Sequence, residues 1–269
     1  RIPVVRAVWS EAELFNCAIE SIRSSDQVKK IIFGLLTTLM VENLYAEPAI
    51  SVYEVAIPPG GESVAVDVAT AFNATEVGKQ NPGFVHFNRM QWNGANPATH
   101  FTVWLYNSRA EQAAYMEKLR GSPEFLQYLR SMDTISTPVR QMSLEVIKNW
   151  GEVSNDHRFW VIMNVSVQNP ALILSALDDF NEAVGERQGE AWLLRIAFGG
   201  DRPSGAASHQ LALGYKDMLE WDEWNSTLQG SEAYMALGNA LRGNVEFIDR
   251  YVAHNVKIFN QGISLEDVQ

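Results

Sequence analysis

Two histidines have the residue type and the spacing that chemistry could use. His100 and His209 are separated by 109 residues, and each begins an expected strand after a loop rich in turn-forming residues. Imidazole titrates near neutral pH, so each histidine could be an acid–base catalyst or a ligand for a metal or haem iron. The alternative is structural: each ring could fasten the preceding hairpin loop to its strand. Both interpretations predict that the two positions are equivalent.

A second set of polar side chains is expected to line a space between two sheets. Side chains alternate between the two faces of a strand. A polar group in an enclosed space must form a hydrogen bond with the protein, with water or with a ligand. Alternation along the expected second strands points His86, Asn88 and Arg195 inward, and the first and last strands add Tyr53, Asn164, Glu145 and His254. These residues could orient a bound ligand. They could equally form hydrogen-bond networks of the core or lie at its rim.

Aromatic residues share the strand face of the two histidines. Trp104 and Tyr106 follow His100 at alternate positions, and Tyr215 occupies the place of Tyr106 in the second half. Such rings could stack a planar ligand, or they could fill the interface between the sheets. Trp221 and Trp224 form a helical stripe, which indicates either packing or a contact in a homodimer.

Composition and motifs exclude several classes of function. The chain has 32 Asp and Glu against 21 Lys and Arg, a formal charge of −11, so it lacks the clustered positive charge that nucleic acids and anionic membranes attract. His-Glu-x-x-His, Gly-x-Ser-x-Gly, phosphate-loop and Gly-x-Gly-x-x-Gly patterns are absent from the sequence. No metal site is predicted, and the sequence requires no cofactor.

The N-terminal region has the three parts of a secretory signal peptide. Lys29 and Lys30 precede an apolar run over 31–41, and Glu42 to Ala46 supply a cleavage region. The apolar run is shorter than the roughly 20 residues that cross a bilayer. We therefore expect a signal peptide over 29–46 and export to the periplasm or outside the cell. An amphipathic helix followed by a buried helix is the alternative.

Residues 1–28 would then precede the signal peptide. They are interpreted as an untranslated leader or a disordered extension, with Val28 as the initiation point. Residues 1–46 contain five basic and five acidic residues, so the net charge of −11 belongs to the remaining chain. The single cysteine, Cys17, also lies in this region. Cleavage would exclude a cysteine nucleophile from the mature protein, which is not expected to contact a membrane.

The rest of the chain is a duplicated unit. An ungapped offset of 109 aligns 50–151 with 159–260. Each copy has the pattern of a strand, a helix, a hairpin, a helix that breaks at Gly121 or Gly230, and a last strand. This βαββαβ order is the ferredoxin-like unit, and packing two such antiparallel sheets face to face would bury both. The predicted class is α+β, with repeats at 47–152 and 153–260 and a tail at 261–269.

The order of elements and the duplication resemble the dimeric α/β-barrel superfamily. That superfamily includes antibiotic-biosynthesis-type monooxygenases, stress-responsive barrel proteins and haem-handling proteins, and the resemblance spans about 48–260. It implies a fold rather than an activity. We expect an exported protein that binds a small, partly apolar or aromatic molecule between the sheets. The alternatives are a cofactor-independent or haem-dependent monooxygenase-like enzyme, and a non-catalytic dimeric interaction protein.

Overall fold

A computed structural model describes residues 48–202 and 205–260. The predicted leader (1–28), signal peptide (29–46) and tail (261–269) lie outside these described residues, as does Cys17. Among the described residues, no helix has the length and apolar character needed to span a membrane.

The first half of the described chain has the predicted βαββαβ order, with two of its helical segments divided. Its elements are β1 (Ala49–Ala56), α3 (Glu62–Asn73), α4 (Glu76–Lys79), β2 (Phe84–Gln91), β3 (His100–Tyr106), α5 (Arg109–Arg120), α6 (Pro123–Asp133) and β4 (Thr137–Gly151). Ser108 caps α5 by accepting from the Glu111 amide, and Ser122 caps α6 by accepting from the Phe125 amide. The predicted break at Gly121 is therefore confirmed.

The second half repeats this order. Its elements are β5 (Phe159–Val167), α7 (Pro170–Val184), β6 (Glu190–Phe198), β9 (His209–Tyr215), α8 (Met218–Leu228), α9 (Glu232–Leu241) and β10 (Val245–Asn260). A small hairpin of β7 (Asp201–Arg202) and β8 (Gly205–Ala206) extends the loop between β6 and β9. Asp217 and Ser231 cap α8 and α9, at positions equivalent to Ser108 and Ser122.

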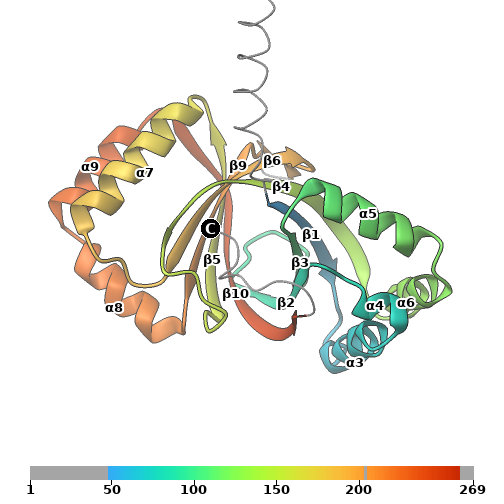
Figure 1. Cartoon of the computed structure of the whole chain (residues 1–269). Helices are drawn as coiled ribbons and strands as arrows, with labels where there is room; N and C mark the ends of the chain where they lie inside the picture. Colours follow the sequence, from blue (N-terminus) through green and yellow to red (C-terminus); the bar gives the residue numbers. More distant parts are fainter. Residues whose placement is uncertain (1–47, 203–204, 261–269) are drawn as a thin grey trace, which may run out of the picture. The chain divides into compact units, whose positions relative to one another are not determined.

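The strands of the two halves form one closed barrel. Its order is β1-β3-β2-β10-β5-β9-β6-β4, and all the neighbouring pairs are antiparallel. The halves join twice, where β2 pairs with β10 and where β4 pairs with β6. Figure 1 shows the long, bent strands β4 and β10 at these joins. The predicted fold, two ferredoxin-like units whose antiparallel sheets face each other in an α/β barrel, is confirmed.

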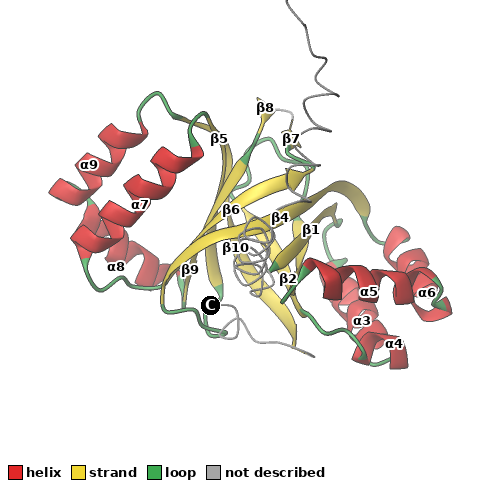
Figure 2. Ribbon diagram, turned by 45° about the horizontal axis from the view of Figure 1, so that its top comes forward, coloured by secondary structure: helices red, strands yellow, loops and turns green. Residues whose placement is uncertain are grey.

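The barrel strands bury both of their faces. One apolar cluster lies in the barrel interior and includes Ile50, Phe101, Leu144, Trp192 and Ala253. The outer faces pack against helices, with α3 to α6 on one side and α7 to α9 on the other (Figure 2). The fold therefore offers two kinds of space for a ligand: inside the barrel, and between a sheet and its helices.

The offset between the two halves changes along the chain. His100 and His209 are equivalent at an offset of 109, but their ladder partners Arg89 and Arg195 differ by 106. The ladder partners Val55 and Val165 of these histidines differ by 110, so the second half has four fewer residues between its first two strands and three more in the hairpin loop that follows. The ungapped alignment is therefore wrong at β6, and because three is an odd number, it assigns β6 side chains to the opposite face.

Candidate functional site

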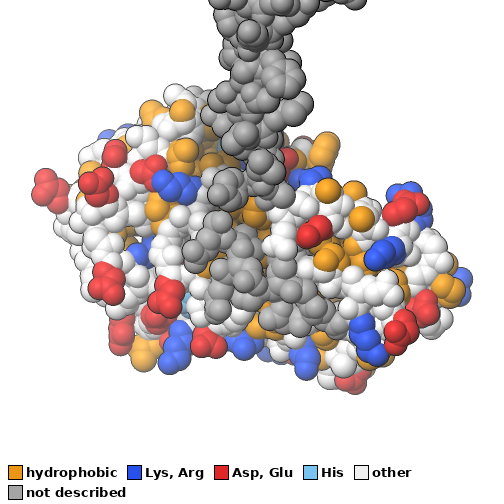
Figure 3. Space-filling view, in the orientation of Figure 1, with side chains coloured by type: hydrophobic (Ala, Val, Ile, Leu, Met, Phe, Trp, Pro, Cys, Tyr) orange, Lys and Arg blue, Asp and Glu red, His pale blue; other side chains and the backbone are white. Residues whose placement is uncertain are grey.

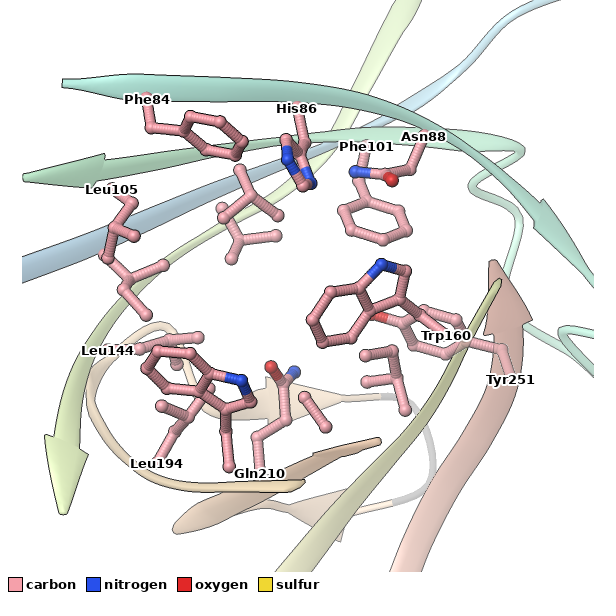
Figure 4. A pocket seen from close by; sticks show the side chains of 16 residues that line it. Phe84, His86, Asn88, Phe101, Leu105, Leu144, Trp160, Leu194, Gln210 and Tyr251 are labelled. Carbon is pink, nitrogen blue, oxygen red and sulfur yellow. The ribbon is translucent and has the colours of Figure 1, made fainter. Parts of the chain in front are cut away.

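The barrel encloses a cavity of about 80 Å³ to which all eight strands contribute (Figure 4). Most of its lining is apolar, and the polar exceptions include His86, Asn88 and Gln210. Pockets for drug-sized ligands hold roughly 300–1,000 Å³. A space this small suits a molecule of a few heavy atoms.

Three of the residues expected to point inward do so. His86 and Asn88 are buried and line the barrel cavity. Asn164 is fully buried, and its Oδ1 accepts a hydrogen bond from Gln210 Nε2 at 2.9 Å. Burial lowers the pKa of His86 to about 3, with a smaller contribution from the Arg158 charge, so the ring is neutral at neutral pH.

Arg195 and Glu145 do not face the interior, and that prediction is wrong. Arg195 is on the outer face of β6, where its side chain is 57% exposed and forms an ion pair with Glu145. The shift of three residues described above accounts for Arg195, since Leu194 takes the inward place. On β4, Leu144 is the fully buried inward residue, and alternation sends Glu145 outward.

Tyr53 and His254 were also expected inside the barrel, and they too lie outside it. Val52 belongs to the interior cluster, so its neighbour Tyr53 points toward the helices, edge-on to Trp104. His254 packs edge-on against Phe159, which belongs to the outer cluster with Tyr215 and Trp224. Both errors come from assigning the wrong face of a strand, because sequence alternation alone does not say which face is inward.

His100 and His209 contribute to none of the cavities described here. His100 Nε2 lies 2.9 Å from Glu62 Oε2, and its Nδ1 lies 2.8 Å from Thr99 Oγ1. His209 Nδ1 lies 2.9 Å from Ser208 Oγ. These contacts suit the structural interpretation, in which the ring fixes the start of its strand. A catalytic role for either histidine stays a prediction.

The aromatic residues of the same strand face point toward the helices rather than between the sheets. Trp104 and Tyr106 pack in the cluster under α3 to α6, and Tyr215 packs in the cluster that includes Trp224. Trp104 also lines a cavity of about 160 Å³ in the first half. The idea that these rings fill the interface between the sheets is therefore wrong, and stacking against a ligand stays a prediction.

The largest of the three cavities described here, about 530 Å³, lies between the barrel strands and helices α7, α8 and α9. Its volume is in the range of small-molecule pockets. Its aromatic lining residues are Trp150, Phe180, Tyr215, Trp221, Trp224, Tyr234 and Phe247. We call this space the helix–sheet cavity.

One partly buried arginine gives the helix–sheet cavity a strong polar group. Arg187 Nη2 donates to Tyr215 Oη at 3.3 Å and to the Glu190 carbonyl oxygen at 3.4 Å, which are long hydrogen bonds. Within the described part of the chain, Arg187 forms no ion pair, and its Nε has no hydrogen-bond partner. Burial lowers the pKa of Arg187, and Tyr215 and Glu190 oppose that shift.

Trp224 adds a second donor to this lining. Its indole Nε1 is buried and has no partner among the described residues. Trp224 is 8% exposed and packs with the partly buried Trp221, so the stripe is packed within the chain. Burial raises the pKa of Tyr215, so its hydroxyl stays protonated and can also donate.

Sequence reasoning missed Arg187, Trp160 and Gln210. Arg187 lies in a short loop before β6, and a single charged residue in a polar loop gives no signal of burial. Gln210 is equivalent to Phe101 at the offset of 109, and Trp160 is equivalent to Ile50 at the offset of 110 that relates β1 to β5, so comparison with these apolar interior residues could have assigned both to the interior.

The described residues give no fit for a metal ion or for a haem held by histidine or cysteine. They contain no group of three or more His, Cys, Asp or Glu side chains that could hold a metal ion. The helix–sheet cavity has room, but its described lining includes neither histidine nor cysteine. His86 faces a space too small for a porphyrin.

On the face drawn in Figure 3, acidic and basic side chains are spread among one another, and neither sign forms one large patch.

Comparisons with known proteins support the fold. No family model and no curated protein matches the chain. Among solved structures, a candidate monooxygenase from Fusobacterium nucleatum has a TM-score of 0.55 at 15% identity, covering 81% of this chain and 97% of that one. A candidate monooxygenase from Lactobacillus acidophilus has a TM-score of 0.53 at 10% identity, with 80% and 97% covered.

A third structure, described as an anthrone oxidase-like protein, has a TM-score of 0.51 at 14% identity, covering 82% of this chain and 95% of that one. At sequence identities this low, the structural similarity shows a shared fold and not a shared activity. The chain has the ferredoxin-like fold of the dimeric α/β-barrel proteins, as its order of elements predicted.

Proposed function

We propose that the protein binds a small, mainly aromatic molecule carrying an anionic or carbonyl oxygen, in the helix–sheet cavity of the second half. The observation that carries this proposal is Arg187, a partly buried arginine whose two hydrogen bonds to described residues are both long and whose Nε is buried without a partner among them. A buried charge without an ion pair is costly, and a ligand oxygen would offset that cost.

The other walls of the cavity suit the rest of such a ligand. Trp150 and Phe180 come from β4 and α7, and Trp221 and Trp224 come from α8. Aromatic faces and edges at several angles favour stacking and edge contacts with a planar ring system. The Trp224 indole and the Tyr215 hydroxyl can donate to a second ligand oxygen. The ligand would therefore be oriented by its polar end and held by its apolar body.

Titration with 2-naphthoate, followed by quenching of tryptophan fluorescence, tests this proposal. We expect saturable binding, weakened at least tenfold by Arg187→Met, which removes the donors but keeps an unbranched apolar chain. Arg187→Lys should retain part of the affinity. Arg120→Met, at an exposed position on α5 far in sequence from the cavity lining, is the matched control. Equal affinity of wild type and a folded Arg187→Met variant would overturn the proposal.

Oxygenase activity in the same cavity is the second candidate. It is favoured by the fold shared with two candidate monooxygenases and an anthrone oxidase-like protein. For anthrone, the balanced reaction takes one O₂, removes two hydrogens from the ring methylene, and gives anthraquinone and one water. Arg187 could stabilise the enolate that forms when the methylene loses a proton. Formation of anthraquinone with equal oxygen uptake would support this activity, and binding without oxidation would leave only the binding proposal.

Export is proposed on sequence grounds. The charged, apolar and cleavage regions of 29–46 have the order of a signal peptide. Expression of the full chain in a bacterium, followed by fractionation and N-terminal sequencing, tests this proposal. A mature protein that begins at Glu47 in the periplasm or medium is expected, and an unprocessed cytoplasmic chain would contradict it.

Self-association into a homodimer is a separate proposal. The sequence suggested it through the helical stripe of Trp221 and Trp224. Because this stripe packs within the chain, a homodimer would need another surface. Light scattering of the mature protein would decide between a monomer and a dimer.

A further inference from the structure

We propose that the barrel interior is a second binding site, separate from the helix–sheet cavity, for a small neutral molecule that carries a hydroxyl group. The inference does not depend on the proposed function above, because none of the residues that line the barrel cavity lines the helix–sheet cavity. It rests on two buried polar atoms, on the character of the walls and on the volume.

Two side chains in the barrel cavity have polar atoms without partners. His86 Nε2 on β2 and Trp160 Nε1 on β5 are both buried and form no hydrogen bond with any described residue. His86 is 5% exposed. Figure 4 shows both rings directed into the cavity from different strands, with the Asn88 side chain beside them. An unsatisfied buried polar atom costs about 1–3 kcal/mol, so a bound partner would be favoured here.

The walls select a neutral ligand. No Asp, Glu, Lys or Arg is among the described residues lining this cavity. The low pKa of His86 keeps its imidazole uncharged, since burial disfavours the cation. An ionic ligand would therefore lose its hydration without gaining a counter-charge.

The unpaired atoms His86 Nε2 and Trp160 Nε1 favour a ligand with a hydroxyl group. Trp160 Nε1–H can only donate, so the ligand must supply an acceptor. His86 Nε2 donates in one tautomer and accepts in the other. A hydroxyl both donates and accepts, so it can pair with the indole and with either form of the imidazole. A carbonyl could serve only one of these tautomers.

The volume limits the rest of the molecule. An engineered apolar cavity of roughly 150 Å³ binds benzene, and the barrel cavity has about half that volume. A ligand of three to five heavy atoms, such as a short-chain alcohol, fits this limit. Its alkyl part would contact apolar walls that include Phe84, Leu105 and Leu194.

Titration with 2-propanol, monitored by NMR of ¹⁵N-labelled tryptophan side chains, tests the site. Trp160→Phe assigns the reporting indole resonance. We expect that resonance to shift saturably, with a dissociation constant on the order of millimolar. The exposed Trp92 indole should show only a small linear change, which controls for the effect of the solvent.

Two variants fill the cavity from different strands. His86→Phe removes the partner for the hydroxyl, and Ala212→Leu adds bulk from β9. Each should abolish saturation, and agreement between them guards against misfolding of either one. Arg187→Met should leave the titration unchanged, so this site can succeed or fail independently of the helix–sheet proposal. A Trp160 response that stays linear would mean that the alcohol does not bind in the barrel. A saturable response that persists unchanged in both folded cavity-filling variants would mean that the alcohol binds elsewhere. Either result would overturn the proposal.

Discussion

Arg195 lies opposite His209 in the antiparallel pair of β6 and β9. Arg89 lies opposite His100 in the equivalent pair of β2 and β3. The duplicated unit has therefore kept an arginine and a histidine side by side on the outer face of each sheet. This shared ladder position gives a structural reason for the repeated histidine that does not need a cavity.

The outward position of Arg195 predicts a small effect of its removal. Arg195→Ala should lower the free energy of unfolding by less than about 1 kcal/mol, because its ion pair with Glu145 is largely exposed to solvent. The loss should shrink further at 1 M salt. Denaturant unfolding at two salt concentrations measures both effects. A loss of several kcal/mol would mean that Arg195 has a buried role.

The two equivalent histidines should contribute unequally to stability. His100→Phe removes the contact with Glu62, so we expect a loss of about 1 kcal/mol, or a decrease in Tm of roughly 2–4 °C. His209→Phe is the matched variant, and it should cost less because His209 Nε2 has no partner among the described residues. Thermal unfolding compares them. If either variant instead lost naphthoate binding at full stability, the histidine would belong to a functional site.

The neutral state of His86 predicts a loss of stability in acid. The unfolded chain takes up a proton at this residue near pH 6.5, whereas the folded protein resists it until about pH 3. Stability attributable to His86 is thus complete above pH 6.5 and decreases as the pH falls toward 3. His86→Phe should have a flatter stability profile between these values. Denaturant unfolding at pH 7, 5 and 4 checks this, and parallel profiles would contradict it.

A buried carboxylate at the start of β6 should be more important for stability than the surface charges. Glu190 is fully buried and lies 2.5 Å from His157 Nδ1 and 2.5 Å from Trp192 Nε1. Glu190→Ala leaves both nitrogens without this partner and should cost about 3 kcal/mol or more. Glu190→Gln keeps an oxygen and a nitrogen in place, so it should cost clearly less. Equal losses in the two variants would show that packing, not hydrogen bonding, dominates.

Replacing Gly189 should lower the free energy of unfolding for a steric as well as a conformational reason. Its φ is +67°, and a Cβ there would lie 2.3 Å from the Gly214 carbonyl oxygen. Gly230 has a φ of +79° but open space around a Cβ, so Gly230→Ala isolates the backbone cost of about 1 kcal/mol. Gly189→Ala should cost at least twice as much. Similar unfolding free energies for the two variants would contradict the predicted clash.

The order of elements could be predicted from the sequence because local signals mark it strongly. Ser108 and Asp217 precede helices at matching positions, and both cap them as expected. The pairing of β2 with β10 and of β4 with β6 had no such local signal, since it joins segments from different halves. That the two sheets should face each other followed from the need to bury their apolar faces.

The direction of individual side chains was harder to predict. His86, Asn88 and Asn164 were assigned correctly, whereas Arg195 was reversed by a three-residue shift between the halves. The shift is invisible to an ungapped comparison, because His100 and His209 still align beyond it. Arg187 could not be found at all, since its surroundings include Tyr215 of β9 and Gly151 of β4, which lie far from it in the sequence.

The covalent link between the two halves has a consequence for how the pockets can differ. A barrel made of two identical chains must repeat every cavity across its twofold axis, so any change that enlarges one pocket enlarges both. Here the helix-covered spaces measure about 160 Å³ in the first half and about 530 Å³ in the second. Joining the halves in one polypeptide removes this symmetry constraint. The helix-covered cavity of one half can therefore be small while that of the other half is large.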